Sequence, residues 1–130
     1  MLRTEEFLDI GKIGEVRRLN GRRLDEHDNF SWHIALKEGE KLLGVARLYR
    51  FRDGLFLDTP CLYEQDKAHF EMLFRTLLLK ALLLGAPGAY CEEREEFKKF
   101  GFAPAGEGLM AAKREQIIFP KECGRNNCSE

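Results

Sequence analysis

The chain has 130 residues, of which 44% are hydrophobic and 33% charged, and its formal net charge is -1. This length is enough for one domain with a real core and too short for two. The near-zero charge gives no electrostatic case for binding nucleic acid or an anionic membrane, because both favour a clear basic excess.

The N-terminus, residues 1–6, is followed by no apolar run of signal-peptide length, so we expect a cytoplasmic protein. In that compartment reduced thiols are the default, and Cys61 and Cys91 lie in apolar strand-like surroundings typical of small buried hydrophobes.

Cys123 and Cys128 form a C-x4-C pair in a polar stretch near the end of the chain. One such pair supplies only two of the four ligands that a structural zinc ion needs, so a loose tail is favoured over a metal site. We therefore predict a single domain over residues 1–120, a polar Cys-containing tail over residues 121–130, and no metal ligands.

The first quarter of the chain gives a weak helical pattern. Several glycines break the apolar residues between 5 and 24, and the spacing predicts a short helix over residues 14–19. Residues 25–29, DEHDN, are either a solvated loop or an acidic rim that attracts an amine substrate.

From residue 30 onward the spacing of apolar residues changes from that of a helix to that of strands. Strands are predicted over residues 30–36, 42–51 and 55–57, the last extending toward Cys61. A turn over residues 37–41 and an Asp53-Gly54 hairpin signal join them into an antiparallel meander. Alternation along the second strand puts one set on one face, Leu43, Val45, Arg47 and Tyr49, and the other set on the opposite face, Leu42, Gly44, Ala46, Leu48 and Arg50.

Residues 66–85 carry the strongest helical signal, with apolar residues at helical spacing. Asp66 is a suitable N-cap, and Gly85 followed by Ala86 and Pro87 ends the helix. A buried strand over residues 88–91, parallel to the third strand, follows.

A short helix is predicted over residues 94–100, ended by Gly101. Two further strands, over residues 105–110 and 114–119, close the domain. These elements define an α+β class with a mixed sheet.

Two segments resemble the GNAT superfamily of acyl-CoA N-acyltransferases. Residues 97–102, FKKFGF, are similar to the family's segment F-Y-E-K-L-G-F from its tyrosine onward, and residues 41–48, KLLGVARL, are similar to its turn and strand of form x-x-G-x-A-x-L. The resemblance covers roughly residues 30–119 and implies the GNAT fold: meander, long helix, parallel strand, short helix and closing hairpin. It also implies transfer of an acetyl group from acetyl-CoA to an amine of a small molecule or peptide.

The family's pyrophosphate motif, Q/R-x-x-G-x-G/A, aligns with residues 65–70. The resemblance therefore implies cofactor contacts from this segment, namely Gln65, Lys67, Ala68, His69 and Phe70. Gln65 fits and Ala68 is the smallest replacement for glycine, whereas Phe70 departs from the motif. Either the loop amides cradle the pyrophosphate, with Lys67 and His69 adding positive charge, or Asp66 caps those amides itself.

The same resemblance assigns the chemistry. The backbone near Thr59, Cys61 and Leu62 is expected to hold the thioester carbonyl. Phe97 stands at the position of the family's tyrosine, whose proton goes to the departing thiolate, so Tyr90 or Cys91 are the stand-ins.

A base must take a proton from the attacking ammonium. The candidates are Asp58 and Glu92, with His33 weaker because an outward position on an alternating strand explains it better than catalysis does.

The alternative to an enzyme is a catalytically inactive GNAT-fold binding or interaction module. A third hypothesis gives the tail a metal or redox role through Cys123 and Cys128. A homodimer through the closing strands is compatible with the sequence, which does not require it, and the acceptor is not identified.

Overall fold

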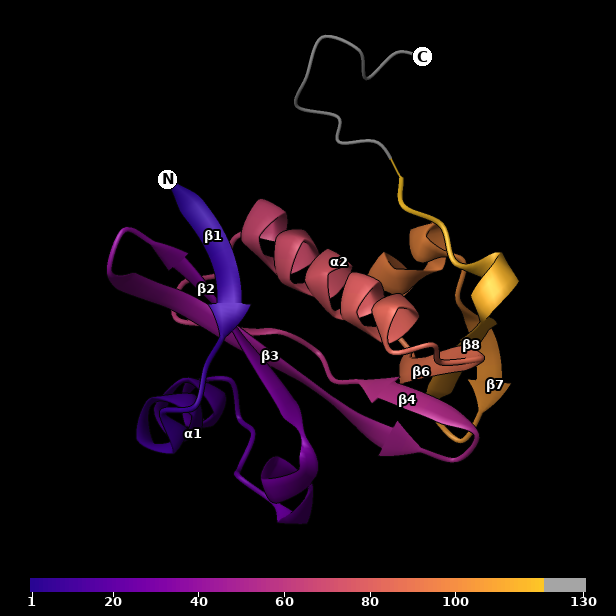
Figure 1. Cartoon of the computed structure of the whole chain (residues 1–130), viewed down its shortest axis with the longest axis horizontal. Coiled ribbons are helices and arrows are strands. Elements are labelled where there is room, and N and C mark those ends of the chain that lie inside the picture. The colour runs from indigo at the N-terminus through magenta and orange to yellow at the C-terminus, as the bar shows by residue number, and fades with distance from the viewer. Residues whose placement is uncertain (121–130) are drawn as a thin grey trace, which may run out of the picture.

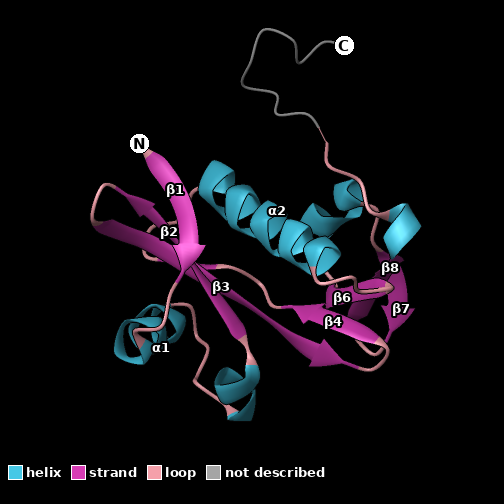
Figure 2. Cartoon of the chain, viewed as in Figure 1, coloured by secondary structure: helices cyan, strands magenta, loops and turns pink. Residues whose placement is uncertain are grey.

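The chain adopts the predicted α+β architecture, in which one mixed sheet carries helices on both faces (Figures 1 and 2). The computed structural model describes residues 1–120, so Cys123 and Cys128 lie outside the described residues. The elements are β1 Leu2–Glu6, α1 Ile10–Leu19, η1 Glu26–Phe30, β2 Trp32–Glu38, β3 Lys41–Phe51, β4 Gly54–Leu57, β5 Cys61–Leu62, α2 Lys67–Leu83, β6 Gly88–Glu92, η2 Glu95–Phe100, β7 Ala103–Gly106, β8 Leu109–Lys113 and η3 Arg114–Gln116. The three η elements are 3₁₀ helices.

The strand order is β1-β2-β3-β4-β6-β8-β7, with β5 beside β3. Helix α2 lies on one face of this sheet, and α1 and η1 lie on the other (Figure 1). A large apolar cluster fills the α2 side, and a smaller one, built on Ile13, Val16, Val45 and Cys61, fills the α1 side. No helix within residues 1–120 is both long and apolar enough to cross a bilayer.

Helix α2 confirms the strongest prediction of the sequence. Its N-cap is Asp66, whose carboxylate accepts a hydrogen bond from the His69 N–H at 3.0 Å. Gly85 follows the helix with φ +77°, a left-handed conformation that glycine adopts without a steric penalty. The buried face is apolar throughout, comprising Leu73, Phe74, Leu77, Leu78 and Ala81.

The meander of β2, β3 and β4 is confirmed, but the predicted faces of β3 are wrong at its start. Leu36 pairs with Gly44 and Lys37 with Leu42, so Leu43 is an extra residue in β3. Such a bulge reverses the alternation before it. Leu42 therefore packs on the α1 side and Leu43 on the α2 side, the opposite of the prediction.

The closing hairpin also differs from the prediction. Its strands are β7 and β8, so the strand predicted over residues 105–110 is wrong, because it runs through the turn between them. No strand follows β8 within the described residues, so the strand predicted over residues 114–119 is also wrong. The turn is formed by Glu107 and Gly108, both with positive φ. Arg114 leaves the sheet, and its guanidinium donates to the carbonyl oxygens of Leu82 and Ala86 at the end of α2. These hydrogen bonds attach the chain after β8 to the carboxyl end of α2.

Three other elements extend or shift the predicted pattern. Strand β1, which the sequence left unassigned, pairs antiparallel with β2. Helix α1 begins at Ile10 and not at residue 14. The helix expected over residues 94–100 is present as the 3₁₀ helix η2, followed by Gly101 with φ +99°.

Strands β4 and β6 are parallel, as predicted, but they pair over only two residues each, Leu55 with Ala89 and Phe56 with Tyr90. Gly54 lies at the start of this pair, where a Cβ would overlap the carbonyl oxygen of Gly88. The short contact between the two halves of the sheet therefore depends on a glycine.

We expect Gly54→Ala to lower the free energy of unfolding by about 1–3 kcal/mol, because the added methyl group would push β6 away from β4. Urea denaturation followed by circular dichroism measures this change. The control is Gly11→Ala on the exposed surface of α1, where the nearest atom lies at 3.4 Å and stability should hold or rise. Equal stability of Gly54→Ala and the parent protein would contradict this role.

Candidate functional site

Beyond the pair of Phe56 and Tyr90, the two halves of the sheet separate. The chain after β4 stays on β3, since the Asp58 N–H donates to Arg47 O at 3.0 Å and β5 also pairs with β3. Strand β6 instead stays on β8 as far as Glu92. We call the region between residues 57–62 and residues 91–94, where the two backbones diverge, the fork.

The backbone donors predicted along residues 59–62 differ in direction. The Thr59 N–H is taken by the preceding carboxylate at 3.0 Å. The Tyr63 N–H donates to Leu43 O at 3.0 Å, so by strand alternation the Cys61 N–H also faces β3 and the polar groups of Leu62 point away from it. On that side the Leu62 carbonyl oxygen accepts from the Asn20 side chain at 2.9 Å. The side chains of Cys61 and Leu62 are buried in the two apolar clusters.

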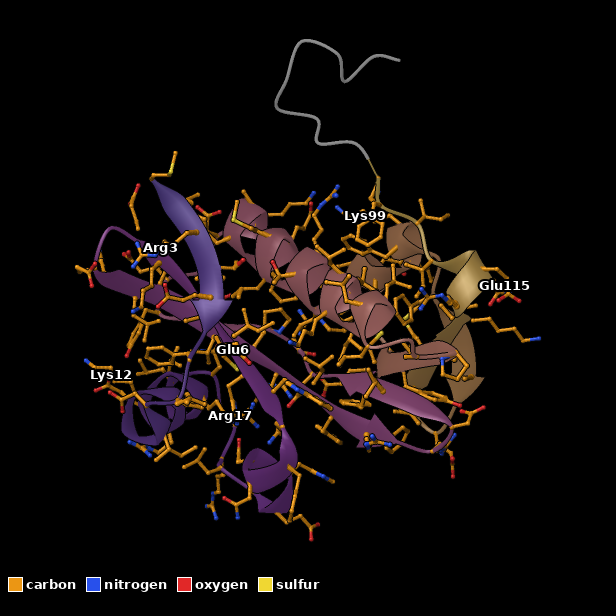
Figure 3. The ribbon with its side chains drawn as sticks, in the orientation of Figure 1. Arg3, Glu6, Lys12, Arg17, Lys99 and Glu115 are labelled. Carbon is orange, nitrogen blue, oxygen red and sulfur yellow. The ribbon has the colours of Figure 1, made fainter. Side chains whose placement is uncertain are left out.

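Asp58 lies at the base of the fork and is almost fully buried, at 4% exposure. Arg47 Nε donates to its Oδ2 at 2.7 Å, and Arg17, which reaches from α1 toward the sheet (Figure 3), donates to the same oxygen at 3.3 Å. Oδ1 accepts from the Thr59 N–H and, at 3.4 Å, from Arg22. Both carboxylate oxygens are therefore engaged.

The second contact of Arg47 holds η1 against the sheet. Its guanidinium donates to both oxygens of Asp25, at 2.7 and 2.9 Å, and lies 3.1 Å from buried Asp28. These hydrogen bonds outweigh partial burial and lower the pKa of Asp25 to about 2. The run predicted as a solvated loop or an acidic rim is therefore a short 3₁₀ helix with Asp25 as its N-cap, in which Glu26 and Asn29 are exposed and Asp28 is buried.

His33 is also buried and not outward, with Nε2 at 3.0 Å from Asp28 O. The structure places it beside the η1 anchor, where it contacts neither Asp58 nor Glu92.

Glu92 is the more accessible carboxylate of the fork. Its Oε1 accepts a short hydrogen bond from the Thr59 hydroxyl and one from Arg22 Nη2 at 2.6 Å. Burial opposes ionisation, but these two hydrogen bonds outweigh it and lower the pKa of Glu92. Oε2 accepts no hydrogen bond from residues 1–120, so an ionised oxygen is left for a ligand.

The structure does not bring Tyr90 to the two carboxylates. Its hydroxyl donates to Asp53 in the β3–β4 turn at 2.6 Å, and its ring packs on Phe51. The hydrogen bond to Asp53 raises the pKa of Tyr90. Cys91 is fully buried on the α2 side, and burial raises the pKa of its thiol.

Asp66 caps the start of α2, and this cap leaves some of the backbone N–H groups of the predicted cofactor loop without an acceptor in the helix. The Asp66 carboxylate takes the His69 N–H, and Asp66 O takes the Phe70 N–H at 2.9 Å. The N–H groups of Lys67 and Ala68 belong to the first turn, whose donors have no acceptor within the helix. Asp66 thus caps the helix while two backbone donors still face outward.

Phe70 and Phe97, the two departures from the family pattern, pack against each other. Their rings are stacked with centroids 5.9 Å apart, and Phe97 also stacks on Phe74 at 4.1 Å. Phe97 is completely buried. It therefore attaches η2 to α2 and presents no polar group to the fork.

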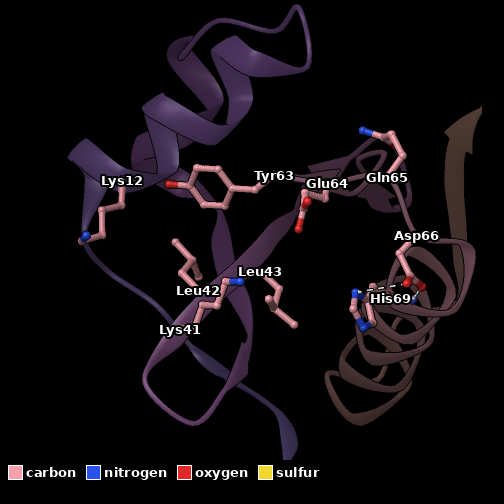
Figure 4. Close-up of a pocket in the computed structure, with 9 residues that line it drawn as sticks. All are labelled: Lys12, Lys41, Leu42, Leu43, Tyr63, Glu64, Gln65, Asp66 and His69. Atoms are coloured by element: carbon pink, nitrogen blue, oxygen red, sulfur yellow. Dashed lines mark hydrogen bonds and ion pairs between the residues drawn. The ribbon is translucent and has the colours of Figure 1, made fainter.

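A cavity of about 670 Å³ opens beside the β5–α2 loop (Figure 4). It is lined by Lys12, Lys41, Leu42, Leu43, Tyr63, Glu64, Gln65, Asp66 and His69. Of the predicted cofactor residues, it brings together Gln65 and His69 only. Two lysines face two carboxylates around it, so the cavity has no excess charge.

Three arginines of the site were missed by sequence reasoning. Arg17 interrupts the buried face of α1 next to Val16, and Arg47 lies between two buried residues of β3. A cation at a core position is the signal that could have indicated a buried carboxylate partner. Arg22 lies in an irregular connection and carries no such signal.

We expect Asp58→Asn to lower the free energy of unfolding by about 3–5 kcal/mol, because it leaves buried guanidinium groups without their charge partner. Urea denaturation at pH 7 measures the loss. Asp53→Asn removes an exposed carboxylate and should cost less than about 1 kcal/mol. Equal losses in the two variants would contradict the anchoring role of Asp58.

Asp25 predicts a pH dependence of stability. Because its folded pKa of about 2 lies below the usual value of about 3.9, its contribution is complete above that value and is lost as pH falls toward 2. The difference in unfolding free energy between the parent protein and Asp25→Asn should therefore shrink between pH 4 and pH 2. Urea titrations at a series of pH values measure it, and a constant difference would refute the ion pair.

No model of a known protein family matches the chain, and no curated protein matches it. Solved structures do match. An acetyltransferase from Bacillus subtilis in complex with CoA has a TM-score of 0.73 at 17% identity, covering 87% of this chain and 99% of that one. A GNAT family acetyltransferase from Brucella melitensis in complex with acetyl-CoA has a TM-score of 0.70 at 12% identity, covering 91% of each chain.

N-acetylglutamate synthase from Neisseria gonorrhoeae, complexed with coenzyme A and N-acetyl-glutamate, has a TM-score of 0.71 at 19% identity. The match covers 87% of this chain but only 35% of the synthase. At such identities the likeness concerns the fold alone. The chain therefore has the GNAT acyltransferase fold.

Proposed function

We propose that this protein transfers an acetyl group from acetyl-CoA to a primary amine. The observation that carries the proposal is the fork, which places an ionised, partly exposed Glu92 opposite the segment whose Leu62 N–H, by strand alternation, points away from β3. That several neighbours of this fold are acetyltransferases crystallised with CoA or acetyl-CoA supports it.

The acyl donor would lie along the residue 57–62 side of the fork. There the Leu62 N–H would donate to the thioester carbonyl, where negative charge develops during attack. The diphosphate would lie at the start of α2, where the N–H groups of Lys67 and Ala68, the helix dipole and the Lys67 ammonium all favour an anion.

The residues present fit this placement. The capping bond of Asp66 uses the His69 N–H and not those of Lys67 or Ala68. The Phe70 ring is engaged by the Phe97 ring and the Arg94 guanidinium, which pack against it. Asp66 places a negative charge nearby, which weakens the site but does not fill it.

In the reaction, the amine loses a proton to the Glu92 carboxylate and attacks the thioester carbon. The new C–N bond forms as the C–S bond breaks, and the sulfur leaves as a thiolate. Phe97 cannot protonate it and the Tyr90 hydroxyl is bound to Asp53, so the thiolate takes its proton from solvent. The lack of a positioned acid costs about 10²–10⁴-fold in rate.

Asp58 is a positioning residue in this scheme, because it holds the arginines around it in place. With both oxygens bound to buried donors, it is less suited to accept a proton than Glu92. Its catalytic role stays a prediction, as do the cytoplasmic location and a homodimer.

The second candidate function is a binding module without catalysis. The stack of Phe70 on Phe97 favours it, because this stack replaces the expected acid with a packing contact. Such a module and an enzyme differ first in whether acetyl-CoA binds.

Calorimetric titration with acetyl-CoA and with free coenzyme A tests the proposal. We expect micromolar binding, roughly -8 kcal/mol. Lys67→Glu should weaken it at least about tenfold, because it reverses a charge beside the diphosphate. Lys113→Glu makes the same charge change at the end of β8, where Lys113 pairs with Gly88 at the start of β6, and should leave binding unchanged.

Absence of binding to the parent protein would refute the transferase. Binding that Lys67→Glu leaves intact would instead refute the placement of the diphosphate at α2.

A further inference from the structure

Arg22 is the most accessible cation of the charge cluster around Asp58 and Glu92. Its Nη2 donates to Glu92 at 2.6 Å, and its Nη1 lies 3.4 Å from Asp58. The Arg22 side chain is 25% exposed, whereas those of Arg17 and Arg47 are at most 5% exposed. Of the three guanidinium groups, that of Arg22 is therefore the one with direct access to solvent, and it can leave without crossing the core.

The charge balance of the cluster specifies what could replace it. Within the described residues the cluster contains four carboxylates, Asp25, Asp28, Asp58 and Glu92, and three guanidinium groups. If the guanidinium of Arg22 left without replacement, two cations would face four anions. A neutral or anionic ligand cannot restore that balance, whereas a protonated amine can.

The surrounding structure allows the Arg22 side chain to move while α1 stays in place. The Asn20 side chain donates to Val16 O at 2.8 Å and to Leu62 O at 2.9 Å, which fixes the end of α1 to β5. The Arg22 N–H donates to Arg17 O at 2.8 Å. Rotation about the long side chain is therefore sufficient to withdraw the guanidinium.

We propose that the Arg22 guanidinium occupies the position of the acceptor's ammonium group, and that the acceptor binds Glu92 by displacing it. This inference rests on the proposed function and narrows it. The acceptor is a protonated primary amine on a chain slender enough to reach the Thr59 and Glu92 side chains. Arg22 is then a specificity-determining residue, because an acceptor that lacks a cationic amine cannot compete with it.

The test is a titration of ¹⁵N-labelled protein with n-propylammonium chloride, followed through the backbone amide signals of Thr59 and Glu92. Sodium chloride at equal concentration controls for ionic strength. If Arg22 closes the site about nine-tenths of the time, Arg22→Ala should bind the probe about tenfold more tightly than the parent protein.

Arg23→Ala is the matched control, because Arg23 is exposed and its side chain makes no contact with the cluster. It should bind the probe like the parent protein. Adding Glu92→Gln to Arg22→Ala should abolish the gain. If Arg22→Ala does not fold, Arg22→Met keeps the apolar stem of the side chain and replaces it in the experiment.

Equal or weaker binding of the probe by Arg22→Ala would overturn the proposal, because Arg22 would then hold the two sides of the fork together. The titration uses no acetyl-CoA, so its result is independent of donor binding. Probe binding without acetyl-CoA binding would retain the amine site and refute the transferase. If acetyl-CoA binds but Arg22→Ala gains no affinity for the probe, the transferase is retained and the amine site is refuted.

Discussion

A buried carboxylate needs partners, and in this protein that need links segments far apart in the sequence. Asp58 contacts Arg47 from the sheet, Arg17 from α1 and Arg22 from the connection that follows. An uncompensated charge at 4% exposure would be strongly unfavourable, so the native state is confined to arrangements that keep the buried contacts of Asp58 with Arg17 and Arg47. The α1 side of the molecule, with a small apolar cluster, thereby gains a defined position on the sheet.

The same cluster separates the two carboxylates of the fork by environment. Asp58 is enclosed by donors and serves as a fixed charge. The Oε1 atom of Glu92 accepts hydrogen bonds from Thr59 and Arg22, whereas its Oε2 atom accepts none from residues 1–120. Neighbouring carboxylates with unlike surroundings commonly divide structural and chemical tasks. Here Asp58 stays beside β3, where the arginines surround it, whereas Glu92 stays beside β8.

Much of the fold could be predicted because it depends on local periodicity. Leu73, Phe74 and Leu77 repeat at helical spacing, and the Asp53-Gly54 hairpin carries its own turn signal. The closing hairpin could not be placed, since its turn uses Glu107, a residue that rarely adopts positive φ. The faces of β3 were reversed at Leu42 and Leu43 because a bulge has no reliable signal in one sequence.

The site was predictable only in outline. Asp58 and Glu92 follow strands, and strand ends are where polar groups gather, so sequence alone could nominate them. Their difference depends on Arg17, Arg22 and Arg47, which lie 11 or more residues away from Asp58 along the chain and meet it only through tertiary contacts. Phe97 could be identified as a departure from the family pattern, but its stack on Phe70 and Phe74 could not.

The charge cluster also bears on how this protein responds to heat. The cost of taking charged groups out of water falls as temperature rises, because their hydration becomes less favourable. Apolar burial gains little over the same range. On the α1 side of the sheet, Arg17 and Arg47 meet Asp58, whereas leucine and phenylalanine side chains form the contact on the α2 side. On warming, the attachment of the α1 side therefore weakens less than that of the α2 side.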